Sequence, residues 1–114
     1  MPGCIFCAIA EGTATADIVY DGDDTLFFRD LSPKAKVHVL GIPKIHLASL
    51  AGVTGEHHEL IGKLLHDAVH VAEEMGLRDS GYRVITNIGP DSGQEVPHLH
   101  VHILGGEPLG PLRC

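Results

Sequence analysis

The segment Pro97-His98-Leu99-His100-Val101-His102-Ile103-Leu104-Gly105-Gly106 places three histidines in alternation with branched aliphatic residues. Successive side chains of a β-strand point to opposite faces of the sheet. The alternation therefore predicts a strand over 97–104, with His98, His100 and His102 on one face and the aliphatic side chains on the other. Imidazole titrates near neutral pH, so such a row favours catalysis over a purely structural role or a plain metal site.

The composition limits the class of protein. A chain of 114 residues is expected to form a single domain over 1–114. Its formal net charge of −7 argues against a partner that is a nucleic-acid polymer, because such binding requires a basic surface. No apolar run approaches the roughly 20 residues of a membrane span, so no membrane partner is expected. No signal peptide is recognisable either, and we therefore expect a cytoplasmic protein.

The chain contains three cysteines, Cys4, Cys7 and Cys114. An odd number of cysteines is a poor basis for a disulfide framework in a reducing compartment. Cys4 and Cys7 form a C-x-x-C motif, whereas Cys114 is expected to be a free thiol at the end of the chain.

The pattern around the histidine segment predicts an α+β fold, with an antiparallel sheet and a helix packed on one of its faces. One long helix is expected over 54–76, because apolar residues recur at intervals of three and four residues. Thr54 is its candidate cap and Gly76 its candidate terminator. A short apolar helical turn, stopped by Gly12, is expected near the N-terminus. The expected strands cover residues 17–21, 25–30, 37–42, 82–88 and 97–104.

The pattern His-φ-His-φ-His-φ-φ, where φ is apolar, resembles the signature of the histidine triad (HIT) family, and 98–104 match every position of it. Other segments resemble the Hint branch of that family, and together they cover nearly the whole chain: 4–9, 28–33, 42–46, 81–83, 87, 93–96 and 105–106. Gly-Gln-Glu-Val before the triad and Pro-Leu-Gly-Pro after it are similar to bacterial members. The resemblance implies an HIT-like five-stranded antiparallel sheet, one long helix, a short N-terminal helix and a homodimer.

The resemblance also implies a chemistry, namely hydrolysis of purine nucleoside phosphoramidates and of aminoacyl-adenylate-like anhydrides without a required cofactor. His100 would attack the α-phosphorus and form a nucleotidyl-histidine, which water then hydrolyses. His102 would orient or neutralise the phosphate, and Asn87 would donate hydrogen bonds to the phosphate or the leaving group. His98 would support the row of histidines or bind a metal.

The same resemblance assigns the contacts to a purine mononucleotide. Asp30 would accept hydrogen bonds from the ribose hydroxyls. Backbone N–H groups of Gln94 and Glu95, in a loop that also contains Gly93, would bind phosphate oxygens. Taken without the resemblance, Asp30 is a typical turn residue and the apolar contacts are typical core residues. Those apolar residues, which would enclose the purine, are Ile5, Phe6, Ile9, Phe28 and Leu31.

Cys4, Cys7, His46 and His98 form a candidate Cys₂His₂ zinc set. The C-x-x-C motif alone is equally consistent with two small buried apolar side chains. Several HIT relatives bind zinc with this combination, and the resemblance therefore implies a structural zinc ion with four protein ligands.

Three other functions stay open at the level of sequence. One is a nucleotide-binding or interaction module with little catalysis, and another is a metalloenzyme that uses the three histidines directly. A third is a dinucleoside polyphosphate hydrolase, as in another HIT branch. The complete triad together with Asn87 favours the phosphoramidate hydrolase, because a binding module needs no nucleophile.

Overall fold

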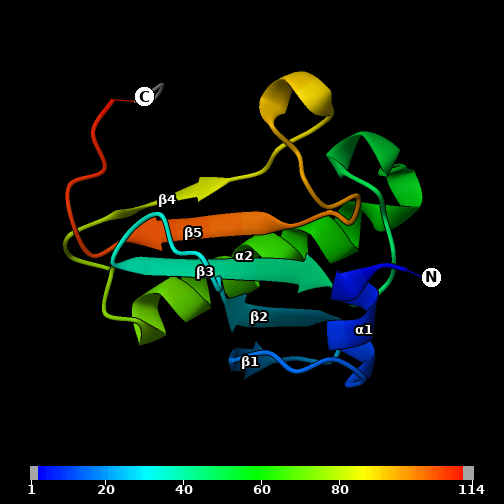
Figure 1. Cartoon of the computed structure of the whole chain (residues 1–114), viewed down its shortest axis with the longest axis horizontal. Coiled ribbons are helices and arrows are strands. Elements are labelled where there is room, and N and C mark those ends of the chain that lie inside the picture. The colour runs from blue at the N-terminus through cyan, green and yellow to red at the C-terminus, as the bar shows by residue number, and fades with distance from the viewer. Residues whose placement is uncertain (1–2, 112–114) are drawn as a thin grey trace.

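The computed structural model describes residues 3–111, whose strands form one antiparallel sheet (Figure 1). Neighbouring strands follow the order β1-β2-β3-β5-β4, so β1 and β4 are the two edges. The strands are β1 (Ile18–Asp21), β2 (Thr25–Arg29), β3 (Val37–Pro43), β4 (Tyr82–Ile85) and β5 (Val101–Gly105). The five-stranded antiparallel sheet expected from the sequence is therefore confirmed.

Helix α2 (His58–Glu74) packs across one face of the sheet (Figure 1). Its buried residues recur at the helical period and meet the inward side chains of the strands. A buried polar contact also joins the helix to the sheet, since the Thr25 hydroxyl donates to Asp67 over 2.7 Å. The apolar core on this side contains Phe27, Val39, Leu64, Ala68, Val71, Ala72, Leu77, Leu99, Val101 and Ile103.

The short helix α1 (Ile5–Glu11) covers part of the other face. Side chains alternate along β2, so Phe27 faces α2 while its neighbours Leu26 and Phe28 face α1. Gly12 ends α1 in the left-handed conformation, with φ 81°, as its position after the apolar turn predicts. The smaller cluster on this side consists of Phe6, Ile9, Leu26, Phe28, Leu40 and Ile42.

Element boundaries differ from the expected ones at two places that matter for the site. The long helix begins at His58 rather than Thr54, because a 3₁₀ turn (Gly55–His57) precedes it. Strand β5 begins at Val101 rather than Pro97, because the backbone N–H of Leu99 donates to Leu47 and not to a neighbouring strand. The alternation of buried and half-buried side chains nevertheless runs through β5 as expected.

Within residues 3–111, no helix has the length and apolar character needed to cross a membrane. The expected free thiol, Cys114, lies outside the described residues.

Candidate active site and metal centre

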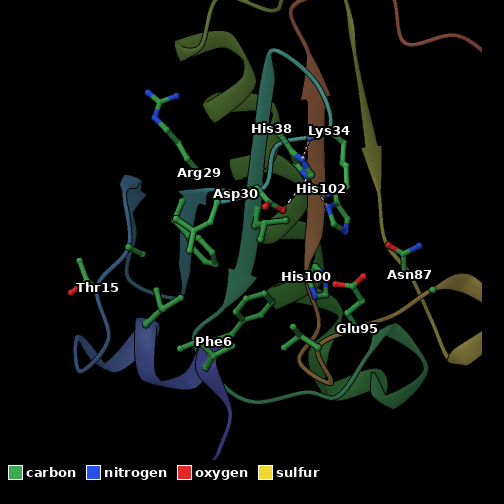
Figure 2. A pocket seen from close by; sticks show the side chains of 18 residues that line it. Phe6, Thr15, Arg29, Asp30, Lys34, His38, Asn87, Glu95, His100 and His102 are labelled. Carbon is green, nitrogen blue, oxygen red and sulfur yellow. Dashed lines mark hydrogen bonds and ion pairs between the residues drawn. The ribbon is translucent and has the colours of Figure 1, made fainter.

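A cavity of about 380 Å³ opens on the face of the sheet opposite α2, in the size range of small-molecule sites (Figure 2). Helix α1, strands β2 and β3, the last two histidines of the triad and the loop after β4 contribute to its wall. Leu31 is 93% exposed and Ile5 is 52% exposed, so these two are not core residues but stand at its rim. The expected nucleotide contacts that line it are Ile5, Phe6, Ile9, Phe28, Asp30, Leu31, Asn87, Gly93, Glu95, His100 and His102.

The middle histidine of the triad, His100, is held by a backbone carbonyl. Its Nδ1 lies 2.7 Å from the carbonyl oxygen of His98. A carbonyl can only accept a hydrogen bond, so the ring proton of neutral His100 is on Nδ1 and the lone pair is on Nε2. The ring is buried and packs edge-on against Phe6, with centroids 5.1 Å apart. In the neutral form, the unprotonated ring nitrogen is therefore Nε2, on a side chain that lines the cavity.

A fourth histidine, His38 on β3, extends the row, and the sequence analysis did not identify it. The backbone N–H of Lys34 donates to His38 Nδ1 over 3.0 Å, so the proton of His38 is on Nε2. That Nε2 lies 2.9 Å from His102 Nδ1 and 3.4 Å from an oxygen of Asp30. His102 therefore accepts at Nδ1 and carries its own proton on Nε2. The signal in the sequence was a polar residue alternating with Val37 and Val39 in an apolar strand.

Burial governs the protonation of this pair. Burial, aided by the neighbouring His100 and His38, lowers the pKa of His102 to about 4. Burial also lowers the pKa of His38, although Asp30 partly opposes the change. Both rings are therefore neutral near pH 7, as their hydrogen bonds require.

The loop between β4 and the triad is braced by its own side chains. Asn87 Nδ2 donates to the carbonyl of Ser92 over 2.8 Å. Gln94 is the one expected nucleotide contact that does not line the cavity. Its side chain accepts a hydrogen bond from the backbone N–H of Gly89 and donates one to the carbonyl of Ala48. Its own backbone N–H points to the Gly89 carbonyl at 3.4 Å, which differs from the free phosphate donor expected there. Gln94 thus shapes the loop rather than the cavity wall.

The four candidate zinc ligands, Cys4, Cys7, His46 and His98, lie together, and their donor atoms are all within 4.8 Å of one another. His98 Nδ1 is 3.4 Å from the Cys4 sulfur and 3.5 Å from the Cys7 sulfur, and His46 Nδ1 is 3.2 Å from the Cys7 sulfur. His98 Nε2 donates to the carbonyl of Pro43 over 3.0 Å, which leaves its lone pair on Nδ1, toward the thiols. The donor set and its tautomer fit a tetrahedral zinc ion.

Burial also sets the protonation of these ligands. It lowers the pKa of His98 and raises the pKa of the Cys7 thiol. His98 is therefore ready to coordinate as neutral imidazole, whereas a metal ion has to displace the proton of Cys7. His98 belongs to this centre and not to the cavity wall, so the predicted row of three histidines is divided between two sites.

Asp30, His38 and His102 form a second group of potential metal donors. Here the hydrogen bonds argue against a metal ion. Lys34 N–H occupies His38 Nδ1, so the proton of His38 sits on Nε2, the atom that would have to face the ion. This group is a hydrogen-bonded chain, whereas the thiol-containing group presents free lone pairs.

The low pKa of His102 predicts a pH-dependent stability. Between pH 6.5 and about 4, the unfolded chain binds a proton at this residue and the folded chain does not. Stability should therefore fall as the pH drops through this window, by about 3 kcal/mol from this residue. Urea unfolding of wild type and His102→Gln across the window measures the effect, and the variant should show a shallower fall.

The same substitution at exposed His66 controls for loss of an imidazole as such. Equal pH slopes for wild type and His102→Gln would contradict the prediction.

Comparisons with known proteins agree with this geometry over nearly the whole chain. A family model described as HIT domain matches residues 11–109. Purine nucleoside phosphoramidase of Escherichia coli (strain K12) is 43% identical over 108 residues, which cover 95% of this chain and 91% of that protein. A 14 kDa zinc-binding protein of Zea mays is 43% identical over 107 residues, covering 92% of this chain and 83% of that protein.

Comparison with solved structures shows the same similarity at the level of the fold. The crystal structure of an HIT family hydrolase from Legionella pneumophila Philadelphia 1 superposes with a TM-score of 0.93 at 40% identity, covering 95% of this chain and 96% of that one. Family model, sequence and structure therefore agree, and the chain belongs to the HIT domain family.

Proposed function

We propose that this chain is a purine nucleoside phosphoramidate hydrolase that forms a covalent nucleotidyl-His100 intermediate. The observation that carries the proposal is the hydrogen bond from His100 Nδ1 to the His98 carbonyl, because it leaves Nε2 as an unprotonated nucleophile at the cavity. The named activity of the Escherichia coli relative supports the substrate class. Aminoacyl adenylates, which carry the same adenylyl group, are included in the proposal.

The proposed reaction uses two displacements. His100 Nε2 attacks the α-phosphorus, the P–N bond breaks, and the amine leaves as it takes a proton from the solvent. Water then attacks the same phosphorus and gives a proton to the solvent, the bond to His100 breaks, and the mononucleotide leaves. His102, which accepts from His38 at Nδ1, offers its Nε2–H to a phosphate oxygen.

The cavity wall suits a nucleotide. Apolar side chains from α1 and β2 form one side, where a purine can be enclosed. Asp30 already accepts from the backbone N–H of Ser32 over 2.7 Å, and its remaining lone pairs are available for ribose hydroxyls. Lys34 supplies a positive charge near His102, on the side where we place the phosphate (Figure 2).

Replacement of the nucleophile tests the activity. The substrate is an adenosine 5′-phosphoramidate with a fluorescent amine, and His100→Ala should lower kcat/KM by at least about 10³-fold, because removal of a covalent nucleophile abolishes the main route. His66→Ala, on the exposed face of α2, should keep wild-type turnover. Rapid quenching of wild type followed by mass spectrometry should reveal the nucleotidyl-enzyme.

Two other results of these assays would favour an alternative function. A folded wild type that binds AMP without turnover would show a nucleotide-binding module. Preferential cleavage of dinucleoside polyphosphates would place the chain with that class of hydrolase.

We also propose that Cys4, Cys7, His46 and His98 hold one structural zinc ion. The grouping of their donor atoms supports this, as does the name of the Zea mays relative. Four protein ligands leave no open position for a reacting water. The ion would connect the start of α1 to the segment that leads into β5.

Elemental analysis tests the zinc proposal. Purified protein should contain about one zinc per chain, and the Cys4→Ser/Cys7→Ser variant should contain none and melt at a lower temperature, because the bound ion stabilises the folded state. Cys114→Ser is the matched control and should retain the metal. A native, folded protein free of zinc would refute the proposal.

We further propose a homodimer in which the β4 edges of two copies pair. Val84 on β4 is 41% exposed and Ile88 beyond it is 44% exposed, which is unusual for an edge that meets only water. The opposite edge, β1, also exposes an apolar residue, Ile18 at 47%, but it is interrupted by a bulge between Ile18 and Tyr20, a common protection against edge pairing.

Sedimentation equilibrium tests the dimer. Wild type should have twice the 12.1 kDa mass of the chain. Val84→Lys should have the mass of the monomer, because the substitution would bury a charge in the dimer interface. Ile18→Lys places the same charge on the β1 edge and should leave the mass unchanged. A monomeric wild type at micromolar concentration would contradict this proposal.

A further inference from the structure

The two thiols and the nucleotide cavity share one short helix. Cys4 caps α1 and Cys7 lies in its first turn, while Ile5, Phe6 and Ile9 of the same helix line the cavity. Because α1 has only 7 residues, its first turn cannot move without moving that part of the wall. The position of the sulfur atoms is thereby linked to the shape of the cavity.

A second link joins the thiols to the nucleophile. His98 faces both sulfurs with Nδ1, and its carbonyl oxygen accepts a hydrogen bond from His100 Nδ1 over 2.7 Å. The ring of Phe6, which is buried, packs against both histidines, with centroids 5.9 Å from His98 and 5.1 Å from His100. A displacement of either cysteine reaches His100 through only one intervening residue.

The thiols are also placed to react with each other. Their sulfur atoms lie within 4.8 Å, and the backbone N–H of Cys7 donates to the Cys4 sulfur at 3.4 Å. Cys4 is half-buried and reachable by small reagents, whereas Cys7 is buried. A disulfide requires the sulfurs to approach to about 2.05 Å, so Cys7 would have to leave its contact with His46.

We propose that Cys4 and Cys7 are a reversible oxidation site whose state controls nucleotide binding. A peroxide oxidises the Cys4 thiol to a sulfenic acid as its O–O bond breaks and one water leaves. The Cys7 sulfur then attacks the Cys4 sulfur, the S–S bond forms, and the hydroxyl leaves with the Cys7 proton as a second water. Two electrons pass from the sulfurs to the peroxide, and a thiol reductant returns them.

Oxidation has two consequences. The disulfide removes two of the four proposed zinc ligands, so oxidised protein cannot hold the ion with this set. It also displaces the first turn of α1, and with it Phe6 against His100. The effect on ligand binding rests on the proposed nucleotide-binding function, whereas disulfide formation does not.

The test uses a Cys114→Ser background, in which Cys4 and Cys7 are the remaining thiols. Hydrogen peroxide should produce a species lighter by two hydrogens that resists alkylation, with release of any bound zinc to a chromogenic chelator. AMP affinity measured by calorimetry should fall at least about fivefold and recover with dithiothreitol. Cys4→Ser in the same background leaves one thiol and should show no reversible change in AMP affinity.

Histidine ring signals in NMR spectra provide a readout without ligand, and the His100 signal should differ between reduced and oxidised protein. Failure of the pair to form a disulfide would overturn the proposal, and so would a disulfide that leaves both this signal and AMP affinity unchanged. Reduced protein that does not bind AMP would instead contradict the proposed function. The NMR comparison would still test whether oxidation of the thiols changes the environment of His100.

Discussion

Alternation along the strands is the constraint on which this structure depends. Every residue of a central strand must face either α2 or the opposite side, where α1 and the cavity lie, because successive side chains point to opposite sides of the sheet. In β5 this places Val101 and Ile103 in the core and turns His102 to the cavity. A shift by one residue would bury the imidazole and expose the aliphatic side chains, so the same burial that stabilises the sheet also fixes the register of the site.

Backbone groups then determine the chemistry of the histidines. A carbonyl accepts the proton of His100 at Nδ1, another carbonyl accepts that of His98 at Nε2, and an amide N–H donates to His38. Each contact selects one tautomer, because a carbonyl cannot donate and an N–H cannot accept. The result is a lone pair on Nε2 of neutral His100 at the cavity, a lone pair on Nδ1 of His98 toward the thiols, and a neutral pair of histidines, His38 and His102, beside Asp30.

The two sites are built from the same short pieces of chain. Helix α1 carries two thiols and three cavity residues, and the segment before β5 carries both His98 and His100. This arrangement needs few residues, which suits a small protein, and it couples the geometry of the two sites. The sulfurs are connected to His100 through Phe6 and through the His98 carbonyl.

Local pattern by itself determined the elements of this protein and the candidate residues. Alternation indicated β5, the three-to-four spacing indicated α2, and residue type singled out the triad and Cys4-x-x-Cys7. Tertiary structure decided which of them meet. His98 joins cysteines 94 and 91 residues away, and His38 reaches His102 diagonally across the pairing of β3 with β5. No local period encodes such contacts, because they arise from the register between strands and from backbone hydrogen bonds that form only when the chain has closed.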